Sequence, residues 1–294
     1  CTVHAIAVNA VMAGCKPEYL PVVIAALEAV CTDEFNIHGV MATTMGATPV
    51  MVVNGPIRDR IGMNSGMGAL GQGNRANASI GRALRLVVRN VGGARPGGTE
   101  RSVLASPTKF TMCFPEFEER SPWPPMHVER GFAADESVVT VFALVGGPHV
   151  LIDQNSRSAH ALAGSLGQSM ASVGNPKTLG GDVLFIICPE HVDTIWRDGW
   201  SKEQIRDRIQ EVTKRPVREL LPSEESGAGI PPSMFGADGP SEEDLSRLMP
   251  KFRSTDNIHI VVAGGEAGKF SAVLAGWASG PGGSMPVSRK IEEV

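Results

Sequence analysis

Three stretches of this chain place a cysteine just before a Pro-Glu pair, and this pattern constrains the fold more than any other feature. The stretches are MAGCKPEY around Cys15, MCFPEF around Cys113 and IICPEH around Cys188. Apolar runs such as those before these cysteines are typical of buried strands, and Pro-Glu is a helix-start signal. The pattern predicts an α/β fold with a mostly parallel sheet and flanking helices, built from repeated strand–Cys–Pro-Glu–helix units.

The remaining segments alternate in the same way. Strands are expected at 2–12, 39–43, 50–53, 109–114, 137–147, 257–265 and 271–277, helices at 17–30, 156–174 and 201–212, a glycine-rich loop leading into a helix at 62–93, and a strand followed by a helix at 181–199. The polar, Gly/Pro-rich stretch 222–244 predicts a flexible surface excursion. We expect a larger α/β domain over 1–178 and a smaller one over 179–294.

Charge and composition exclude several classes of protein. A formal net charge of −4 argues against nucleic-acid binding. No apolar run reaches the ~18 residues that span a bilayer, so no membrane partner is expected. Five cysteines without a CxxC predict reduced thiols and a cytoplasmic location. The chain begins at Cys1; omitted upstream residues explain this more simply than a processed, nucleophilic terminus.

The cysteines are the first candidate site, because ligands bind at the carboxyl ends of the strands in a parallel α/β sheet. Cys15 ranks first as a thiolate near a helix N-terminus, with Glu18 as proton acceptor. Cys113 ranks second, and Cys188 looks most like a core residue. Two chemistries stay open: a thiol nucleophile or redox group, and an iron–sulfur cluster or other metal held by Cys15, Cys113 and Cys188.

The glycine-rich segment GMGALGQGNRANASIGRALRL (66–86) is the second candidate site. Backbone N–H groups of glycines and a following helix N-terminus bind anions, and arginines add bidentate contacts. The dinucleotide fingerprint and the P-loop are both absent. A tight loop before a packed helix is the alternative. The expected substrate-binding residues are Asn54, Asn74, Arg75, Asn77 and Arg82.

The proline-rich segment CFPEFEERSPWPPMHVERG (113–131) is the third candidate site. His127 is the natural acid–base group, with Glu116 or Glu118 orienting it. Trp123 and Arg130 are expected to bind substrate. The alternative is a solvated acidic turn with Trp123 filling the core. His191 and His259 are expected to be structural.

The segments AVNAVMAGCKPEYLPVV, GQGNRANASIGRALRLVVRNVGG and SPWPPMHVERGF resemble a largely uncharacterised bacterial family associated with UGSC-type thiol/selenol proteins. The chain has no CGSC motif, so a redox dithiol role is not carried over. The resemblance implies these site residues: Cys15, Glu18, Asn74, Arg75, Asn77, Arg82, Trp123, His127 and Arg130.

The sequence therefore predicts a cysteine-dependent enzyme that acts on a small carboxylate or phosphate. Cys15 would be the thiolate nucleophile or ligand, and His127 and Glu116 would transfer protons. An iron–sulfur lyase or hydratase that uses Cys15, Cys113 and Cys188 is one alternative. A non-catalytic subunit of a thiol or selenol redox complex is another, and a homo-oligomer stays open.

Overall fold

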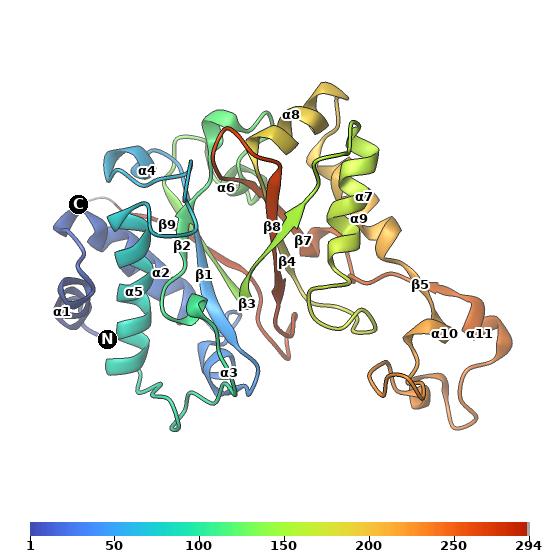
Figure 1. Cartoon of the computed structure of the whole chain (residues 1–294). Helices are drawn as coiled ribbons and strands as arrows, with labels where there is room; N and C mark the ends of the chain where they lie inside the picture. Colours follow the sequence, from blue (N-terminus) through green and yellow to red (C-terminus); the bar gives the residue numbers. More distant parts are fainter. Residues whose placement is uncertain (293–294) are drawn as a thin grey trace.

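The computed structural model describes residues 1–292 and has a mixed α/β fold. Its main strands are β1 (Ala47–Asn54), β2 (Cys113–Pro115), β3 (Val138–Ile152), β4 (Val183–Ile187), β7 (Ile258–Val262), β8 (Phe270–Gly276) and β9 (Val287–Lys290). They form one sheet in the order β2-β1-β3-β8-β4-β7, and β9 also pairs with β3. Figure 1 shows this sheet in the middle of the molecule.

The sheet is mixed, whereas the sequence predicted mostly parallel pairing. Only β1 with β2 and β4 with β7 are parallel; β3 is antiparallel to β1, β8 and β9, and β8 is antiparallel to β4. Parallel neighbours need a long crossover, usually a helix, whereas antiparallel neighbours do not. The helical segments that follow β1 and β4 provide two such crossovers.

The two halves of the sheet repeat one pairing pattern. β1 has a parallel partner, β2, and an antiparallel partner, β3, while β4 has β7 and β8 in the same roles. β3 is irregular between Val145 and His149, where Gly146 has a φ of 77°, and its second part continues along β8. One sheet therefore runs across residue 178, the predicted domain boundary.

The sheet curls, so that its inner face forms a core of its own. This core takes side chains from β1, β2, β3, β4, β7 and β8, among them Val52, Phe114, Phe142 and Val261. The N–H of Phe117, just after β2, donates to the carbonyl of Val262 in β7 at 2.7 Å. The two edge strands of the sheet are thus linked.

Helices cover the outer faces of the sheet. The helices α1 (Val3–Ala13), α2 (Leu20–Val30) and α5 (Arg75–Asn90) lie on one side, and α7 (Ala159–Ser169), α8 (Pro189–Arg197) and α9 (Lys202–Thr213) lie on the other (Figure 1). Short helices α3 (Ile37–Ala42), α4 (Ile57–Arg60) and α6 (Met126–Glu129) lie in the connections. Helices expected near 17–30, 156–174 and 201–212 are confirmed, and Ser201 and Gln204 form a capping box at α9.

The strand predicted at 2–12 is wrong, because this segment is the helix α1. The hydroxyl of Thr2 accepts from the N–H of Ala5 at 3.2 Å, and Gly14 ends the helix in the left-handed region at φ 89°. The strand expected at 39–43 is likewise helical, within α3. Cys15 therefore follows a helix, and Cys113 begins a strand. Only Cys188 stands between a strand and a helix that starts with Pro-Glu.

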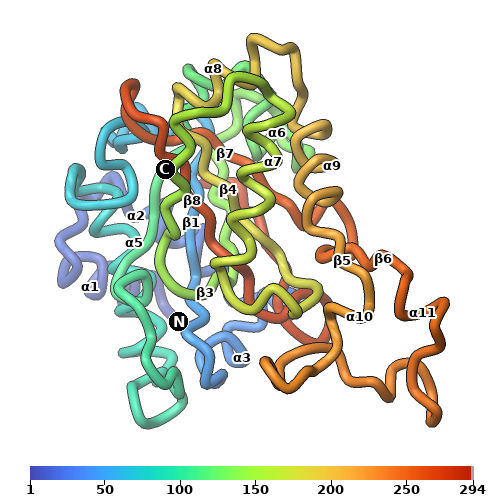
Figure 2. The backbone as a smooth tube through the Cα atoms, turned by 45° about the vertical axis from the view of Figure 1, so that its right-hand side comes forward, coloured from blue at the N-terminus to red at the C-terminus, as the bar shows by residue number. Residues whose placement is uncertain are grey.

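The segment between α9 and β7 projects from the body of the molecule, as Figure 2 shows. It contains β5 (Arg215–Pro216), α10 (Val217–Leu220), α11 (Glu242–Ser246) and β6 (Leu248–Met249). A small cluster of Val217, Leu220 and Ile230 gives it some core of its own. Most residues of 222–244 are exposed, as expected for a surface excursion.

Candidate functional site

The glycine-rich loop is held by two asparagines. The buried side chain of Asn77 accepts from the N–H of Asn64 at 3.2 Å and donates to the carbonyls of Asn64 and Ala69 at 2.8 and 3.0 Å. Asn74 caps α5 and donates to the carbonyl of Gly62 at 2.8 Å. These amides satisfy the loop itself, which favours the tight-loop alternative over a polar ligand pocket.

Cys15 lies beside the first turn of α5, so Cys15 and Arg75 are close enough to belong to one binding site. The Nε of Arg75 donates to the carbonyl of Gly14 at 2.9 Å. Burial raises the pKa of the Cys15 thiol, and this outweighs the opposite effects of the Ser79 hydroxyl and Arg75. Burial, together with the nearby Cys15, raises the pKa of Cys113 as well. Both thiols are therefore held in the protonated form, which does not favour a thiolate at Cys15.

The three Cys-Pro-Glu cysteines do not come together. Cys15 and Cys113 adjoin the core under α1, α2 and α5, whereas Cys188 caps α8 across the sheet. Within residues 1–292, no three His, Cys, Asp or Glu side chains lie close enough to hold a metal ion. Glu18 is exposed and lies 4.0 Å from Lys16.

The carboxylates of the proline-rich segment form a buried network. Glu116 is 0% exposed, and its Oε2 accepts from Nδ2 of Asn54 at 2.7 Å and from the N–H of Met126 at 2.8 Å. Lys202 of α9 lies 3.7 Å from the other carboxylate oxygen. Glu118 also accepts from Asn54, at 3.0 Å. Oε1 of Glu116 and Oδ1 of Asn54 have no hydrogen-bond partner within the described chain, and neither carboxylate forms a hydrogen bond to His127 there.

Three further candidates lie outside the two pockets described below. His127 is fully buried, with Nε2 3.4 Å from the carbonyl of Ala134 and Nδ1 unpartnered within the described chain. Trp123 is part of the core, and its indole N–H donates to the carbonyl of Trp200 at 2.8 Å. The guanidinium of Arg82 stacks 3.9 Å above the ring of Phe110, away from the glycine-rich loop.

Arg130 lines a polar pocket of about 370 Å³ where α6, α9 and β7 meet. Its Nε donates to the hydroxyl of Ser288 at 2.6 Å, and its Nη2 donates to the carbonyl of Pro286 at 2.8 Å. Burial lowers the pKa of Arg130, partly offset by the more distant Asp182. No carboxylate in residues 1–292 forms an ion pair with it, so it is a partly buried cation without a close counter-ion.

A second arginine lines the same pocket. The Nε of Arg206 donates to the carbonyl of Ile258 at 2.9 Å, and its Nη2 donates to Glu129 at 2.9 Å. Lys202 donates to the other oxygen of Glu129 at 2.8 Å. The Nη1 groups of Arg130 and Arg206 have no recorded partner among the described residues, so each keeps donors for a ligand.

A histidine–aspartate pair completes the pocket. His259 lines it and donates through Nε2 to the buried Asp182 at 3.0 Å. Burial alone would raise the pKa of Asp182, but hydrogen bonds from His259, Ser279 and Asn257 outweigh this effect and lower it. Asp182 therefore stays ionised and holds the Nε2–H tautomer of His259, which leaves a lone pair on Nδ1. We call this pocket the Arg130 pocket; Glu129 and Asp256 also line it, whereas Asp182 holds His259 without lining the pocket itself.

Sequence reasoning identified only Arg130 in this pocket, because His259 was expected to be structural. One signal was present: in NIHIVV, alternation places His259 on the same face of β7 as Val261, which is part of the inner core. A histidine on an otherwise apolar face needs a polar partner. That this partner is Asp182, just before the neighbouring strand β4, follows only from strand pairing.

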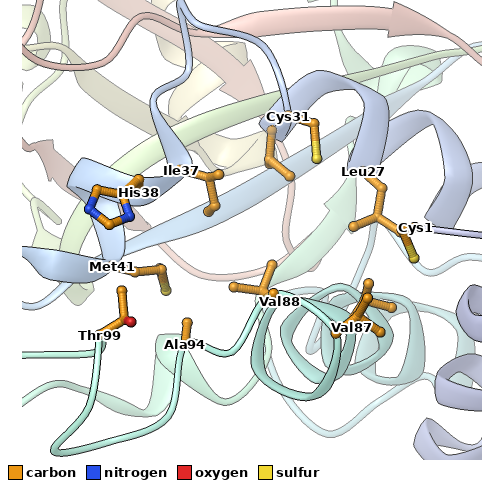
Figure 3. Close-up of a pocket in the computed structure, with 13 residues that line it drawn as sticks. Cys1, Leu27, Cys31, Ile37, His38, Met41, Val87, Val88, Ala94 and Thr99 are labelled. Carbon is orange, nitrogen blue, oxygen red and sulfur yellow. The ribbon is translucent and has the colours of Figure 1, made fainter.

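A second pocket, of about 320 Å³, is mostly apolar and opens between α2, α3 and α5 (Figure 3). Leu27, Met41 and Val88 line it, together with the exposed cysteines Cys1 and Cys31. It offers few polar groups to orient a ligand.

No family model, no curated protein and no solved structure matches this chain. No single helix in residues 1–292 is long and apolar enough to cross a membrane; α1 with Pro17–Val30 passes that test only as a pair bent by 120°.

Proposed function

We propose that the protein is an enzyme that binds a small carboxylate in the Arg130 pocket and moves a proton on it. One observation carries this proposal: a histidine oriented by a buried aspartate lines the same cavity as two arginines with uncommitted donors. Convergent polar groups of this kind in a cavity are the usual mark of an active site.

The arginines supply the binding energy. Fixed contacts to Ser288 and Pro286 hold the guanidinium of Arg130 in place before a ligand arrives. A carboxylate that accepts from Nη1 would form charge-assisted hydrogen bonds, each worth about 1.5–3 kcal/mol. Arg206, held by Glu129, would bind the same oxyanion from the side of α9.

His259 supplies the acid–base group. Its Nδ1 would accept a proton from the bound substrate, and the adjacent Asp182 would stabilise the resulting imidazolium. His259 would then give this proton to a different atom of the substrate, which completes an isomerisation, a hydration or an elimination. This assignment moves proton transfer from His127 and Glu116 to His259, and keeps the predicted small anionic substrate and Arg130.

The test is hydrogen–deuterium exchange into a panel of short mono- and dicarboxylates, followed by proton NMR in D₂O. We expect the wild-type protein to exchange a carbon-bound proton of at least one of them, and His259→Gln to slow this exchange at least ~100-fold. His149→Gln, at an exposed histidine of β3, is the matched control and should leave the rate unchanged. Exchange that survives in His259→Gln, or no exchange with any carboxylate, would contradict the proposal.

A further inference from the structure

A second group of buried reactive side chains lies at the opposite end of β4 from Asp182. Cys188 follows β4 and caps α8, with Pro189 as the first helical residue. Its neighbours are His191 in the first turn of α8 and Ser271 in β8. Cys188, His191 and Ser271 are 3%, 1% and 2% exposed. The six-residue separation along an extended strand puts Cys188 about 20 Å from Asp182.

Hydrogen-bond chemistry limits how protons can be arranged here. Nε2 of His191 lies 3.0 Å from the carbonyl of Asp153, and a carbonyl only accepts, so Nε2 carries a proton. The hydroxyl of Ser271 accepts from the N–H of Cys188 at 3.2 Å, is 2.7 Å from Nδ1 of His191, and is 3.7 Å from the sulfur of Cys188. One hydroxyl therefore bridges the thiol and the imidazole.

Two arrangements satisfy this geometry. In the neutral one, Cys188 donates S–H to the Ser271 oxygen, and the Ser271 hydroxyl donates to Nδ1 of His191. In the ionic one, Nδ1–H of His191 donates to the Ser271 oxygen, and the Ser271 hydroxyl donates to the Cys188 thiolate. The two differ by one proton passed along the chain of bonds, and the hydroxyl is regenerated in each.

Several charges and dipoles favour the ionic arrangement. Burial opposes ionisation, but contacts with His191 and Ser271 outweigh it and lower the pKa of Cys188. Burial likewise lowers the pKa of His191, yet Cys188 and Asp153 raise it above its ordinary value. Asp153 itself stays ionised, since hydroxyl and backbone donors outweigh burial and lower its pKa to about 2. The N-terminal end of α8 adds a positive potential at the sulfur.

Other charged groups nearby pair among themselves. Arg120 is bound to Asp193 of α8 at 3.1 Å and to Glu266, after β7, at 2.8 Å. Glu190, in the first turn of α8, is the remaining acidic group close to Cys188 in the chain. Arg120 offsets one of the two carboxylates that it binds, so the remaining negative charge and Glu190 oppose ionisation of the thiol. His191, which Asp153 supports, and Ser271 are the partners that favour ionisation.

We propose that Cys188 is a second nucleophilic site, whose thiol proton passes through the Ser271 hydroxyl to His191, and that it reacts with small uncharged electrophiles. The thiolate sulfur forms the new S–C bond, and the leaving group departs with its bonding electrons. The proton that left the thiol is then on Nδ1 of His191, which can give it to the leaving group. The main chain at Gly264 passes close to Cys188, since a Cβ at Gly264 would lie 3.8 Å from that of Cys188. The next residue, Gly265, adjoins Met67 of the glycine-rich loop, where a Cβ would lie 3.6 Å from Met67.

The first test needs no access to the buried sulfur. The ultraviolet absorbance of thiolate is titrated against pH in the full chain and in Cys188→Ser, and the difference reports Cys188 alone. We expect it to ionise below the ordinary thiol value of about 8.5. Ionisation of Cys188 only at or above that value would overturn the proposal.

The second test follows the relay. The full chain is treated with iodoacetamide at neutral pH, and alkylation of the Cys188 peptide is followed by mass spectrometry. We expect Ser271→Ala to slow alkylation at least ~10-fold. Ser271→Thr keeps a hydroxyl and should restore most of the rate. Ser223→Ala, at an exposed serine, is the control and should leave the rate unchanged. An equal rate in Ser271→Ala, or no restoration in Ser271→Thr, would contradict the relay.

Discussion

The buried lysine that joins α9 to the proline-rich segment should be essential for stability. Lys202 is 3% exposed in its side chain and donates to the carbonyl of Pro124 and to Glu129, both at 2.8 Å, while Glu116 lies at 3.7 Å. In Lys202→Met, Glu129 keeps Arg206, but the fully buried Glu116 loses its nearest cation. Removing one partner of a buried ion pair costs about 3–5 kcal/mol, because the other charge stays buried and uncompensated.

Urea unfolding followed by circular dichroism measures this loss. We expect Lys202→Met to lower the free energy of unfolding by about 3–5 kcal/mol and the midpoint of thermal unfolding by on the order of 10 °C. Lys16→Met, in an ion pair with both side chains about half exposed, is the matched control and should change it by less than about 0.5 kcal/mol. In the Lys202→Met background, Glu116→Gln should recover part of the loss. A Lys202→Met protein as stable as Lys16→Met would refute the argument.

Three further predictions concern the fold. Glu100 accepts from Lys109 at 2.8 Å and from Arg85 at 3.0 Å, and the contacts of Lys109 and Ser102 outweigh burial and lower the pKa of Glu100. The stabilisation from Glu100 is therefore present at neutral pH and is lost as the pH falls through the folded pKa. The urea midpoints of Glu100→Gln and wild type should differ at pH 7 and converge in acid. Asn77→Ala should cost about 1–3 kcal/mol in urea unfolding and open 62–73 to limited proteolysis, since it leaves loop backbone groups unpaired; unchanged cleavage would count against this role. Gly81→Ala should cost about 1–3 kcal/mol, because a Cβ would lie 2.8 Å from the N–H nitrogen of Met112, whereas Gly71→Ala, with its nearest atom at 3.8 Å, should be neutral.

Local signals made the second half of the fold predictable. The apolar run before Cys188, the Pro189 start of α8 and the capping box of Ser201 and Gln204 are complete within a few residues. The first helix was missed for the opposite reason. Its alternating small and β-branched residues fit a strand equally well, and its packing on α5, including the bond from Asn90 to Asn9 at 2.8 Å, lies far away in the sequence.

The candidate site was predictable only in part, for a similar reason. Arg130 stood out because it lies in a dense polar segment, and a small anionic ligand was expected. Arg206 and His259 lie on other elements, and Asp182 meets His259 only because β4 pairs with β7. Asp182 precedes β4 and Cys188 follows it, so the two groups lie at opposite ends of one strand.

The most direct test of the central claim is whether Arg130 binds a carboxylate. Calorimetric titration of the full chain with the panel of short carboxylates should find one that binds, and Arg130→Gln should weaken its affinity about 10- to 150-fold, the equivalent of one charge-assisted contact of about 1.5–3 kcal/mol. Arg89→Gln, at an exposed arginine near the end of α5, is the control and should bind like wild type. Equal affinity in wild type and a folded Arg130→Gln, or no carboxylate binding to the wild-type chain, would contradict the assignment of the Arg130 pocket.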